Sequence, residues 1–526
     1  MKPFSWAIAL GGLLVATAAG AQTLTVGVRG GPESMDPHFS ALGPQADAVK
    51  HIYDTLVGTG VDLQLEPSLA TSWEPIDDVT WEFKLREGVK FHDGSDFTAE
   101  DVKFSIERIP NVTGPTTMEI YIRRIADVEI VDDYTLRITT DGPAATLPFD
   151  FVRLFIVSSA AAADFSDIES ATEGFNSGEA AIGTGPFKYV SWEPKGELVL
   201  ERFDDHWRGA APWESVVRRE ISDDSSRLAA LKAGDVDLIN YVSSADYLAL
   251  ERDNDINTFL GDSVYVMNLQ LDQRDETPKV YAKDGSPLGE NPFQKKAVRE
   301  ALDLAIDRET MVDIVLEGLG TPARQLMPEG FFGSSDEIEA KPYDPDRAME
   351  LLAEAGYPDG FAMDLYCTND RLPGDGAICE GLGQMFAQIG IDTNVNAISR
   401  SVYFPAQARK EYSAFMNGWG TLTGEASYTL GSLAHSPNEE VRMGAFNRIE
   451  YENPEVDRLM QAGSKELDAD KRRAFYEEAM KLTVEDRAYL PIVVLQTVWA
   501  ANADAVGDVA TRADEETLAF YIQPAS

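Results

Sequence analysis

The N-terminal half of the chain changes repeatedly between strand-like and helix-like patterns of apolar residues. Residues 23–28 and 81–85 alternate apolar and polar positions, which is typical of β-strands with one buried face. Residues 46–57 instead place apolar side chains three or four positions apart, which predicts a helix. Further on, Thr98 followed three residues later by Asp101 fits a capping box and predicts a helix start. Strands and helices are therefore mixed from the beginning of the chain.

The C-terminal half contains a clearer succession of helix, strand, helix and strand. Asp344 before Pro345 predicts a helix start, with the aspartate as N-cap, and Gly356 ends that helix. Apolar patterns then predict strands at 363–366, 393–398 and 492–498, and helices at 308–316, 377–389 and 470–483. This order of elements indicates an α/β architecture.

The first residues fit a secretory signal peptide. Lys2 precedes an apolar run over residues 4–16, and Ala19-Gly20-Ala21 fits the small-residue rule for signal peptidase. We therefore predict cleavage after Ala21 and a mature chain that starts at Gln22. A membrane anchor is the alternative, and it is disfavoured because the run is shorter than the ~20 apolar residues that span a bilayer.

The charge balance excludes several classes of partner. The chain has 526 residues, 44% of them hydrophobic, and a net charge of −44 from 89 acidic and 45 basic residues. Nucleic-acid binding needs a basic face, and anionic membranes attract basic segments. We therefore expect neither partner, and interpret the acidic surface as solubilising.

Two cysteines, Cys367 and Cys379, are present. An even pair in an exported protein favours a disulfide. The residues between them include several that favour turns, which lets the two ends approach each other. We predict a disulfide between them, with two free buried thiols as the alternative.

No motif for catalysis is apparent. The five histidines lack the paired spacing of zinc hydrolases, and there is no G-x-S-x-G nucleophile motif. The glycine-rich segment at 318–323 follows a predicted helix, whereas a dinucleotide site would require it to follow a strand. We expect no catalytic residue, no cofactor and no metal site. A secreted hydrolase is the rival hypothesis, and it would require turnover of a substrate such as a peptide library.

Several segments together resemble one protein family. The segment LREGVKFHDG at 85–94, continued by FTAEDV at 97–102, is close to that family's signature region. Further matching segments are SMDPH at 34–38, IYDTL at 52–56, GTGPF at 183–187, AIDR at 305–308, DP at 344–345 and GYP at 356–358. The family is that of the large extracytoplasmic solute-binding proteins of peptide, nickel and glutathione ABC importers, known as family 5. The resemblance extends over nearly all of the mature chain.

The resemblance implies an α/β, two-lobed periplasmic-binding-protein fold of type II, large cluster, with an extra N-terminal subdomain. The two lobes are expected to close on a ligand by a hinge motion. Lobe I is expected at 22–61 and 183–270, with a C-terminal return at 491–526. The small subdomain is expected at 62–182, and lobe II at 271–490.

The resemblance also points to a site near Trp419. Peptide-binding members have an aspartate three residues after a Gly-Trp pair, where it holds the amino group of the peptide. Here Gly418-Trp419 is present, but Leu422 occupies the aspartate position. Since a leucine cannot pair with an ammonium group, recognition of ordinary peptides is in doubt. Trp419 is expected to form an apolar wall of the cleft, with core packing as the alternative.

The segment after Trp419 is similar to that of glutathione-binding relatives. Glu425 is therefore a candidate to receive a cationic group of the ligand, and Thr421 and Thr423 are expected beside it. The alternative for Glu425 is a carboxylate that caps a nearby helix.

Two arginines are candidates for binding a ligand carboxylate. Arg153 lies in a largely apolar run, where a guanidinium needs a partner, and it can clamp a carboxylate through two parallel hydrogen bonds. An internal salt bridge, for example with Asp150, is the alternative. Arg400 follows the predicted strand at 393–398, and its alternative is a surface position.

The family arrangement implies four more residues that face the cleft. They are His38, Phe39, Tyr265 and Asn268.

We conclude from the sequence that the protein captures a peptide-like or small zwitterionic solute in the periplasm for an ABC importer. Its expected partners are the small-molecule ligand and an inner-membrane ABC permease with a cytoplasmic ATPase, and we expect a monomer. The alternative within the family is a protein that binds an oligosaccharide or a metal chelate. A ligand-presenting partner of a chemoreceptor is a further possibility that the sequence leaves open.

Overall fold

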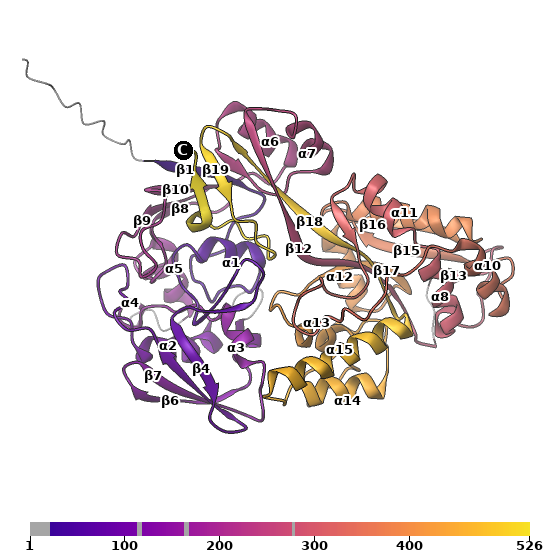
Figure 1. The fold of residues 1–526 in the computed structure, drawn as a ribbon, viewed down its shortest axis with the longest axis horizontal. Coiled ribbons are helices and arrows are strands. Elements are labelled where there is room, and N and C mark those ends of the chain that lie inside the picture. The colour runs from indigo at the N-terminus through magenta and orange to yellow at the C-terminus, as the bar shows by residue number, and fades with distance from the viewer. Residues whose placement is uncertain (1–21, 113–117, 163–167, 276–278) are drawn as a thin grey trace, which may run out of the picture.

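The chain folds into two lobes that lie side by side and are joined by two long strands (Figure 1). The computed structural model describes residues 22–112, 118–162, 168–275 and 279–526. The signal peptide expected at 1–21 lies outside these residues. Within the described part of the chain, no helix has the length and apolar character needed to cross a membrane.

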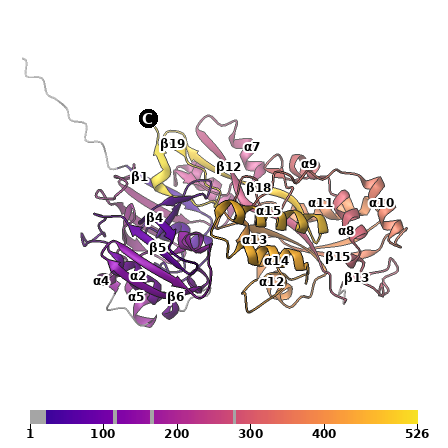
Figure 2. The same ribbon diagram turned by 60° about the horizontal axis from the view of Figure 1, so that its bottom comes forward.

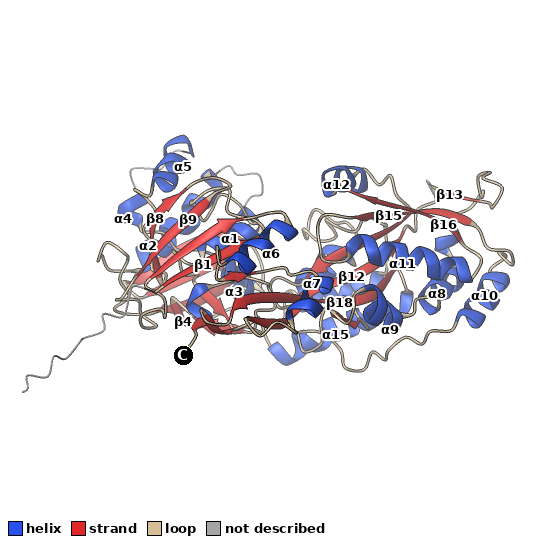
Figure 3. Cartoon of the chain, turned by 90° about the horizontal axis from the view of Figure 1, so that it is seen from above, coloured by secondary structure: helices blue, strands red, loops and turns tan. Residues whose placement is uncertain are grey.

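One 12-stranded sheet runs through both lobes, and its main path has the order β13-β15-β17-β12-β18-β11-β1-β10-β9-β8. The joining strands are β12 (Ile256–Leu271) and β18 (Tyr489–Asn502), which pair antiparallel and are called the hinge strands below. Figure 3 shows them between the lobes. The first lobe contributes β1 (Thr23–Val28), β8 (Phe187–Trp192), β9 (Glu197–Arg202), β10 (Ser215–Glu220) and β11 (Leu238–Ile239). The second lobe contributes β13 (Val280–Tyr281), β14 (Gly320–Pro322), β15 (Ala362–Thr368), β16 (Asp392–Ile398) and β17 (Ala414–Gly420).

The first lobe also contains three smaller sheets. A four-stranded sheet has the order β4-β5-β7-β6, and two hairpins pair β2 with β3 and β19 with β20. These strands are β2 (Val57–Thr59), β3 (Leu65–Pro67), β4 (Ala70–Pro75), β5 (Thr80–Leu85), β6 (Ile125–Asp132), β7 (Thr135–Thr140), β19 (Val506–Val509) and β20 (Ile522–Pro524). The helices of this lobe are α1 (Gly43–Val49), α2 (Ala99–Arg108), α3 (Leu147–Asp150), α4 (Ser159–Ala162), α5 (Ile168–Ser177), α6 (Asp224–Ala233) and α7 (Ser244–Leu250).

The second lobe is richer in helix. Its helices are α8 (Lys296–Leu304), α9 (Arg308–Thr310), α10 (Pro345–Glu354), α11 (Asp375–Gln388), α12 (Arg400–Ala408), α13 (Ala426–Leu433), α14 (Pro454–Gly463) and α15 (Ala469–Asp486). Figure 2 turns α13, α14 and α15 toward the viewer, beside the first lobe. This mixed α/β, two-lobed architecture is the fold class expected from the sequence.

Local capping signals place helix starts correctly. Thr98 and Asp101 form the capping box of α2, with both reciprocal hydrogen bonds present. Asp344 caps α10 by accepting from the backbone N–H of Arg347, and Pro345 occupies the first turn. These starts are confirmed because the bonds that define them span only three residues.

Two predicted helices are wrong in extent. The helix expected at 46–57 is α1, which begins at Gly43 and ends at Val49, because the next residues pair with a distant segment. The carbonyl of Ile52 accepts from the N–H of Gly185 at 2.9 Å. Gly183 packs against the same carbonyl, and a Cβ there would lie 1.9 Å from its oxygen.

The helix expected at 308–316 becomes the short α9 followed by a π-helical turn at Met311–Val315. The turn brings the side chains of Met311 and Val315 against Gly381 of α11. Tertiary packing therefore overrides the local pattern at this point.

The disulfide and the α/β packing fix the loop that leaves β15. Cys367 and Cys379 form a disulfide that ties the end of β15 to α11. Both side chains are fully buried in the core cluster of the second lobe. The loop between them, residues 369–374, is thereby held at the edge of the sheet.

The lobes also touch at a distance from the hinge strands. Arg442 of the second lobe donates to the backbone oxygen of Arg123 at 2.8 Å, and Ala145 N donates to Ser464 O at 3.1 Å. The rings of Phe149 and Phe332 lie 6.2 Å apart. The space between the lobes is thus bounded by the hinge strands on one side and by these contacts on another.

Candidate functional site

The carboxyl ends of parallel strands from both lobes point to one region. In the first lobe β1 runs parallel to β11, and in the second lobe β15 runs parallel to β17. Ligands of open α/β sheets bind at the carboxyl ends of such strands. The residues found just after these strand ends include Arg29, Tyr241, Asn369 and Thr421.

A cavity of about 380 Å³ lies between the lobes at these strand ends. Its volume falls in the range of small-molecule sites, roughly 300–1,000 Å³. The lining comes from both lobes and from the hinge strand β18, and includes Arg29, Tyr241, Leu319, Asn369, Leu372 and Gln496. A ligand in this cavity would contact both lobes at once, which is what a closing hinge requires.

Glycine residues on β17 leave room for side chains of neighbouring elements at the cavity edge. A Cβ on Gly418 would lie 2.2 Å from the side chain of Leu372, and one on Gly420 would lie 2.8 Å from the ring of Tyr265. Tyr265 of β12 pairs with Gly420 in the sheet. The Gly-Trp-Gly sequence of β17 therefore lets Leu372 and Tyr265 lie over the strand.

Arg371 brings a positive charge to this edge. Its Nη1 donates to Asn417 Oδ1 at 2.7 Å and to the backbone oxygen of Gly418 at 2.8 Å. The guanidinium lies 5.9 Å from the ring centre of Tyr265. Neutral partners fix its position without cancelling its charge, so Arg371 is suited to meet a carboxylate.

Glu515 places a buried carboxyl group against the hinge strands, next to Tyr241 of the cavity lining. Its Oε1 accepts hydrogen bonds from Ser263 Oγ of β12 at 2.6 Å and from Thr497 Oγ1 of β18 at 2.7 Å. Burial raises the pKa of Glu515, against these hydroxyl hydrogen bonds, which lower it.

Tyr265 lies within reach of both charges. Burial raises the pKa of its hydroxyl, and the carboxylate of Glu515 raises it further, while the guanidinium of Arg371 lowers it. The region between the lobes is thus positive on the side of β15 and negative over the hinge strands. Such a bipolar cleft complements a zwitterion.

Trp419, expected as an apolar wall, lies in an aromatic cluster at the end of β17. Its ring centre lies 5.5 Å from that of Tyr428 and 5.3 Å from that of Phe446. The side chain is only 8% exposed, and its Nε1 has no hydrogen-bond partner among the residues that the structure describes. Trp419 thus combines core packing with an unused donor, and its role at the ligand stays a prediction.

The polar residues after Trp419 are buried. Thr421 Oγ1 is hydrogen-bonded to Thr429 Oγ1 at 2.9 Å, whereas Thr423 Oγ1 finds no hydrogen-bond partner within the described part of the chain. Glu425 is fully buried and pairs with Arg472 of α15 at 3.2 Å. It is the N-cap residue of α13 but makes no side-chain capping bond. Burial raises the pKa of Glu425 to about 8, although Arg472 opposes this.

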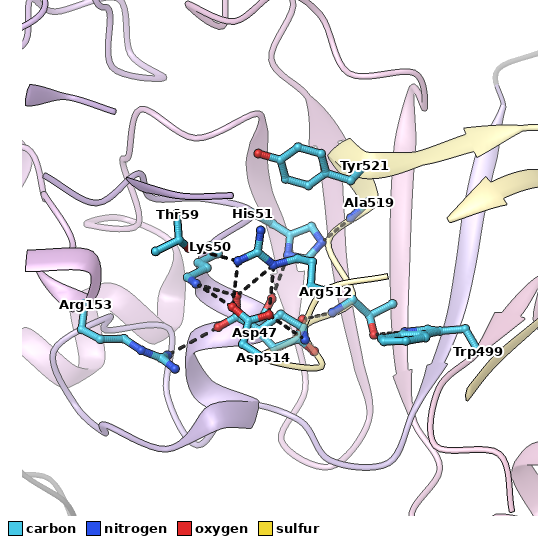
Figure 4. Close-up of polar contacts among 12 residues, drawn as sticks. Asp47, Lys50, His51, Thr59, Arg153, Trp499, Arg512, Asp514, Ala519 and Tyr521 are labelled. Atoms are coloured by element: carbon cyan, nitrogen blue, oxygen red, sulfur yellow. Dashed lines mark hydrogen bonds and ion pairs between the residues drawn. The ribbon is translucent and has the colours of Figure 1, made fainter. Parts of the chain in front are cut away.

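Arg153 takes part in an internal salt bridge. It pairs with Glu516 at 3.4 Å rather than with Asp150, and it is 4% exposed. Figure 4 shows the cluster to which it belongs, in which Lys50 and Arg512 also meet the carboxylates of Asp514 and Glu516. Arg400, by contrast, is exposed at the start of α12.

The other expected residues lie around the site or away from it. His38 is buried, accepts from Arg108 and donates to the carbonyl of Phe155, and burial lowers its pKa to about 4. Phe39 is half-buried in the same loop. Asn268 is fully buried and bonds along β12 to Val266 and Gln270. Of the four residues placed by the family arrangement, the structure brings Tyr265 to the bipolar region.

Sequence reasoning missed Arg371, Tyr241 and Glu515. Arg371 lies in a loop that the sequence marks only as turn-rich, between the two cysteines. The short segment before Tyr241 gives a weak strand signal, and β11 has two residues. For Glu515 the sequence offers no signal, because its partners are over 200 residues away in β12 or belong to another strand.

A larger cavity of about 700 Å³ flanks the hinge strands near residues 321–331. Two of its charged groups meet partners within the protein: Arg324 pairs with Glu329, and Asp262 accepts from Gln496. The smaller cavity lies at the carboxyl ends of parallel strands from both lobes and is therefore the candidate site.

Comparison with known proteins gives a consistent result. The family model of bacterial extracellular solute-binding proteins, family 5 Middle, matches residues 64–440. The glutathione-binding protein GsiB of Salmonella paratyphi A is 27% identical over 512 residues, which is 95% of each chain. These matches extend over most of the chain and include the cavity-lining segments of both lobes.

Solved structures with the same fold include two ligand complexes. The periplasmic binding protein DppA of Helicobacter pylori, associated with an ABC transporter and bound to the peptide STSA, is 25% identical with a TM-score of 0.75, covering 96% of this chain and 98% of that one. The binding protein AgaA of A. tumefaciens, bound to agropinic acid, is 25% identical with a TM-score of 0.74, covering 96% and 99%.

Proposed function

The chain belongs to family 5 of the bacterial extracellular solute-binding proteins, a family of binding proteins rather than enzymes, and we propose that it binds a small zwitterionic, peptide-like solute between its lobes. As the solute-binding component of an ABC importer, it delivers this solute to the membrane permease. Closure around the solute gives the permease a surface that differs between loaded and empty protein.

The observation that carries the proposed ligand class is the pair of opposite charges beside the cavity. Arg371 lies on the second lobe, and Glu515 lies over the hinge strands. A zwitterion places a carboxylate and an ammonium group a few ångströms apart, and each finds its counter-ion here. An oligosaccharide carries no charged group that could pair with Arg371 or Glu515. Its binding would therefore leave the charges of both side chains uncompensated.

The cavity also disfavours a metal chelate as the ligand. None of the five histidines is among the cavity-lining residues, and each is at least nine-tenths buried. Histidine is the commonest protein ligand for a transition metal. The zwitterion therefore fits the lining better than either alternative within the family.

Leu422 further restricts the class of solute that we propose. It stands where peptide-binding relatives are expected to hold the amino group with an aspartate, and its side chain packs in the apolar cluster around Trp419. We therefore favour solutes whose amino group occupies a different position from the N-terminal amino group of an ordinary peptide. The relatives named above bind glutathione and agropinic acid, which makes these two compounds natural probes.

The remaining expectations belong to the same proposal. We infer export with cleavage after Ala21, a periplasmic location, and a monomer in solution. The segments 22–61, 183–270 and 491–526 form one lobe, 62–182 the small subdomain, and 271–490 the other lobe. Mass spectrometry of protein secreted to the periplasm gives the mature N-terminus.

Isothermal titration calorimetry tests the ligand class. Glutathione, agropinic acid and di- and tripeptides are titrated into refolded protein that has been stripped of co-purified solute. At least one of these zwitterions is expected to bind with micromolar or better affinity, and maltotriose is expected to give no heat. Binding of maltotriose alone would refute the zwitterion proposal while leaving the solute-binding role intact.

A further inference from the structure

We propose that Glu515 receives the cationic group of the solute, in the role that an aspartate at position 422 would have in peptide-binding relatives. This inference deepens the proposed function and rests on it. The question arises because Leu422 cannot hold an ammonium group, while a zwitterion enclosed between the lobes needs a carboxylate partner for it.

Glu515 is held at the point where the lobes are joined. Its Oε1 accepts from Ser263 on β12 and from Thr497 on β18, so one carboxylate oxygen bridges both hinge strands. The backbone at Glu515 has φ +65°, a left-handed conformation uncommon outside glycine. The chain adopts this conformation where it returns to the hinge, and the conformation directs the side chain onto the strands.

The carboxylate lies next to a residue of the cavity wall. Of the residues around it, Ser263 lines the larger cavity, and Gln496, next to Thr497, lines both cavities. Tyr241, another lining residue, is a hydrogen-bonding neighbour of Glu515. The hydroxyl bonds from both hinge strands fall on Oε1, which leaves Oε2 for Tyr241 and for a solute.

The charge of Glu515 is uncompensated, unlike that of its sequence neighbours. Asp514 pairs with Arg512 at 2.7 Å, and Glu516 pairs with Lys50 at 2.5 Å. In the part of the chain that the structure describes, no lysine or arginine lies within 4.0 Å of the Glu515 carboxylate. A carboxylate that is only 4% exposed and bonded to hydroxyl groups alone is costly to keep ionised, and a ligand cation would remove that cost.

Other carboxylates beside the cleft are already occupied. Asp375 accepts from Thr368 and from the backbone N–H groups of Arg371 and Leu372. Asp224 pairs with Arg227 at 2.7 Å. Glu425 lies inside the second lobe and pairs with Arg472 through one of its two oxygens. Glu515 is thus the carboxylate next to the cavity that has most to gain from a cationic ligand.

The test compares two probes and two variants by calorimetry. The probes are glutathione and its deaminated analogue, glutaryl-cysteinylglycine, which lacks the ammonium group. The variants are Glu515→Gln, which keeps the shape and an acceptor oxygen, and Asp508→Asn, an exposed change in the same C-terminal segment. Wild type and Asp508→Asn are expected to bind glutathione about 10- to 100-fold more tightly than the analogue. This is the difference expected when the analogue lacks one charge-assisted hydrogen bond.

Glu515→Gln is expected to abolish this preference by weakening glutathione binding while leaving the analogue unchanged. Its empty form is expected to melt at or above the temperature of the wild type, because a buried uncompensated charge has been removed. A purely structural role for Glu515 would lower the melting temperature and weaken both probes equally, and would overturn the assignment.

Two further results separate this inference from the proposed function. If Glu515→Gln keeps the full preference for glutathione, Glu515 is not the cation receptor and the proposed function stands. If the wild type binds neither glutathione nor any zwitterion of the calorimetric panel, the proposed function fails and the assignment of Glu515 fails with it.

Discussion

The buried charge cluster of the first lobe and the cleft between the lobes treat charged side chains in opposite ways. In the cluster, Arg153, Lys50 and Arg512 meet the carboxylates of Asp514 and Glu516, so each charge is compensated within the protein (Figure 4). At the cleft, Arg371 is bonded to neutral groups and Glu515 to hydroxyl groups.

This difference separates buried charges that stabilise the fold from buried charges that are available to a ligand. A compensated cluster of this kind joins segments of the chain that are far apart in sequence, and breaking it leaves a partner unpaired. Charges that are positioned by neutral groups keep their field for a ligand. The same residue type, arginine, is therefore structural at position 153 and a binding candidate at position 371.

The largest effect is expected from breaking the cluster. Arg153→Ala removes a partner of Glu516 and is expected to lower the free energy of unfolding by about 3 kcal/mol, measured by urea denaturation. Glutathione affinity of the folded protein is expected to stay within a factor of three. Arg202→Ala, which removes a more exposed ion pair with Asp204, serves as the control and is expected to cost under ~1 kcal/mol.

Unchanged stability with lost ligand affinity in Arg153→Ala would contradict the structural role given to Arg153. A stable variant that no longer binds carboxylate-bearing solutes would make Arg153 the ligand clamp that the sequence allowed. Its pairing with Glu516 would then be a feature of the empty state.

Removal of the disulfide is expected to have the next largest effect. The bond spans 12 residues, and the double change Cys367→Ser with Cys379→Ser is expected to cost about 3 kcal/mol of stability. Because the bond holds the loop containing Arg371, affinity for glutathione is expected to fall as well, by about threefold. Urea denaturation and calorimetry on the same preparations measure both. Unchanged affinity would show that the loop keeps its position without the bond.

Arg371 tests the cleft side of the comparison. Arg371→Gln is expected to weaken glutathione binding about 100-fold, the loss expected when a buried carboxylate loses its charged partner. Its melting temperature is expected to change little, because the arginine neutralises no carboxylate within the described structure. Arg347→Gln, in the exposed face of α10, is the matched control and is expected to bind like the wild type. Equal loss for a glutathione amide lacking free carboxylates would argue against a carboxylate role.

Many of the contacts in this comparison could not be predicted from the sequence. The capping signals at Thr98 and Asp344 were readable because their bonds span three residues. The two-lobed fold followed from the family resemblance. The pairing of Arg153 with Glu516 joins residues 363 positions apart, and the sequence offered Asp150 as the nearer candidate. Local pattern favours near partners, whereas buried charges take whichever partner the fold brings close.

The candidate site shows the same limit. The family arrangement placed Tyr265 near the site because it fixes the strand of that residue, and the role it gives Trp419 stays a prediction. Arg371 and Glu515 lie in irregular segments whose path depends on a disulfide, a left-handed residue and two crossing strands. No periodicity describes such segments, so charges on them became visible only with the fold.

The last prediction concerns pH at the second contact between the lobes, where Asp150 faces Glu425. Burial raises the pKa of Asp150 to about 7, opposed by Arg123 and Arg124, and that of Glu425 to about 8, opposed by Arg472. Each carboxyl group is thus harder to ionise in the folded protein than in the unfolded chain. The unfolded chain loses these protons from about pH 4 upward, so the folded state loses stability as pH rises to about 8.

Calorimetric melting of the empty protein between pH 5 and pH 8 measures this loss. The melting temperature of the wild type is expected to be higher at pH 5 than at pH 8, because both carboxyl groups bind their protons more tightly in the folded state. Asp150→Asn removes one of the two groups and is expected to flatten the profile, whereas Asp141→Asn, at the exposed Arg442 contact, should leave its slope unchanged. A wild-type profile that rises toward pH 8 would mean that Arg472 and Arg123 keep both carboxylates ionised. This contact would then belong with the compensated cluster of the first lobe.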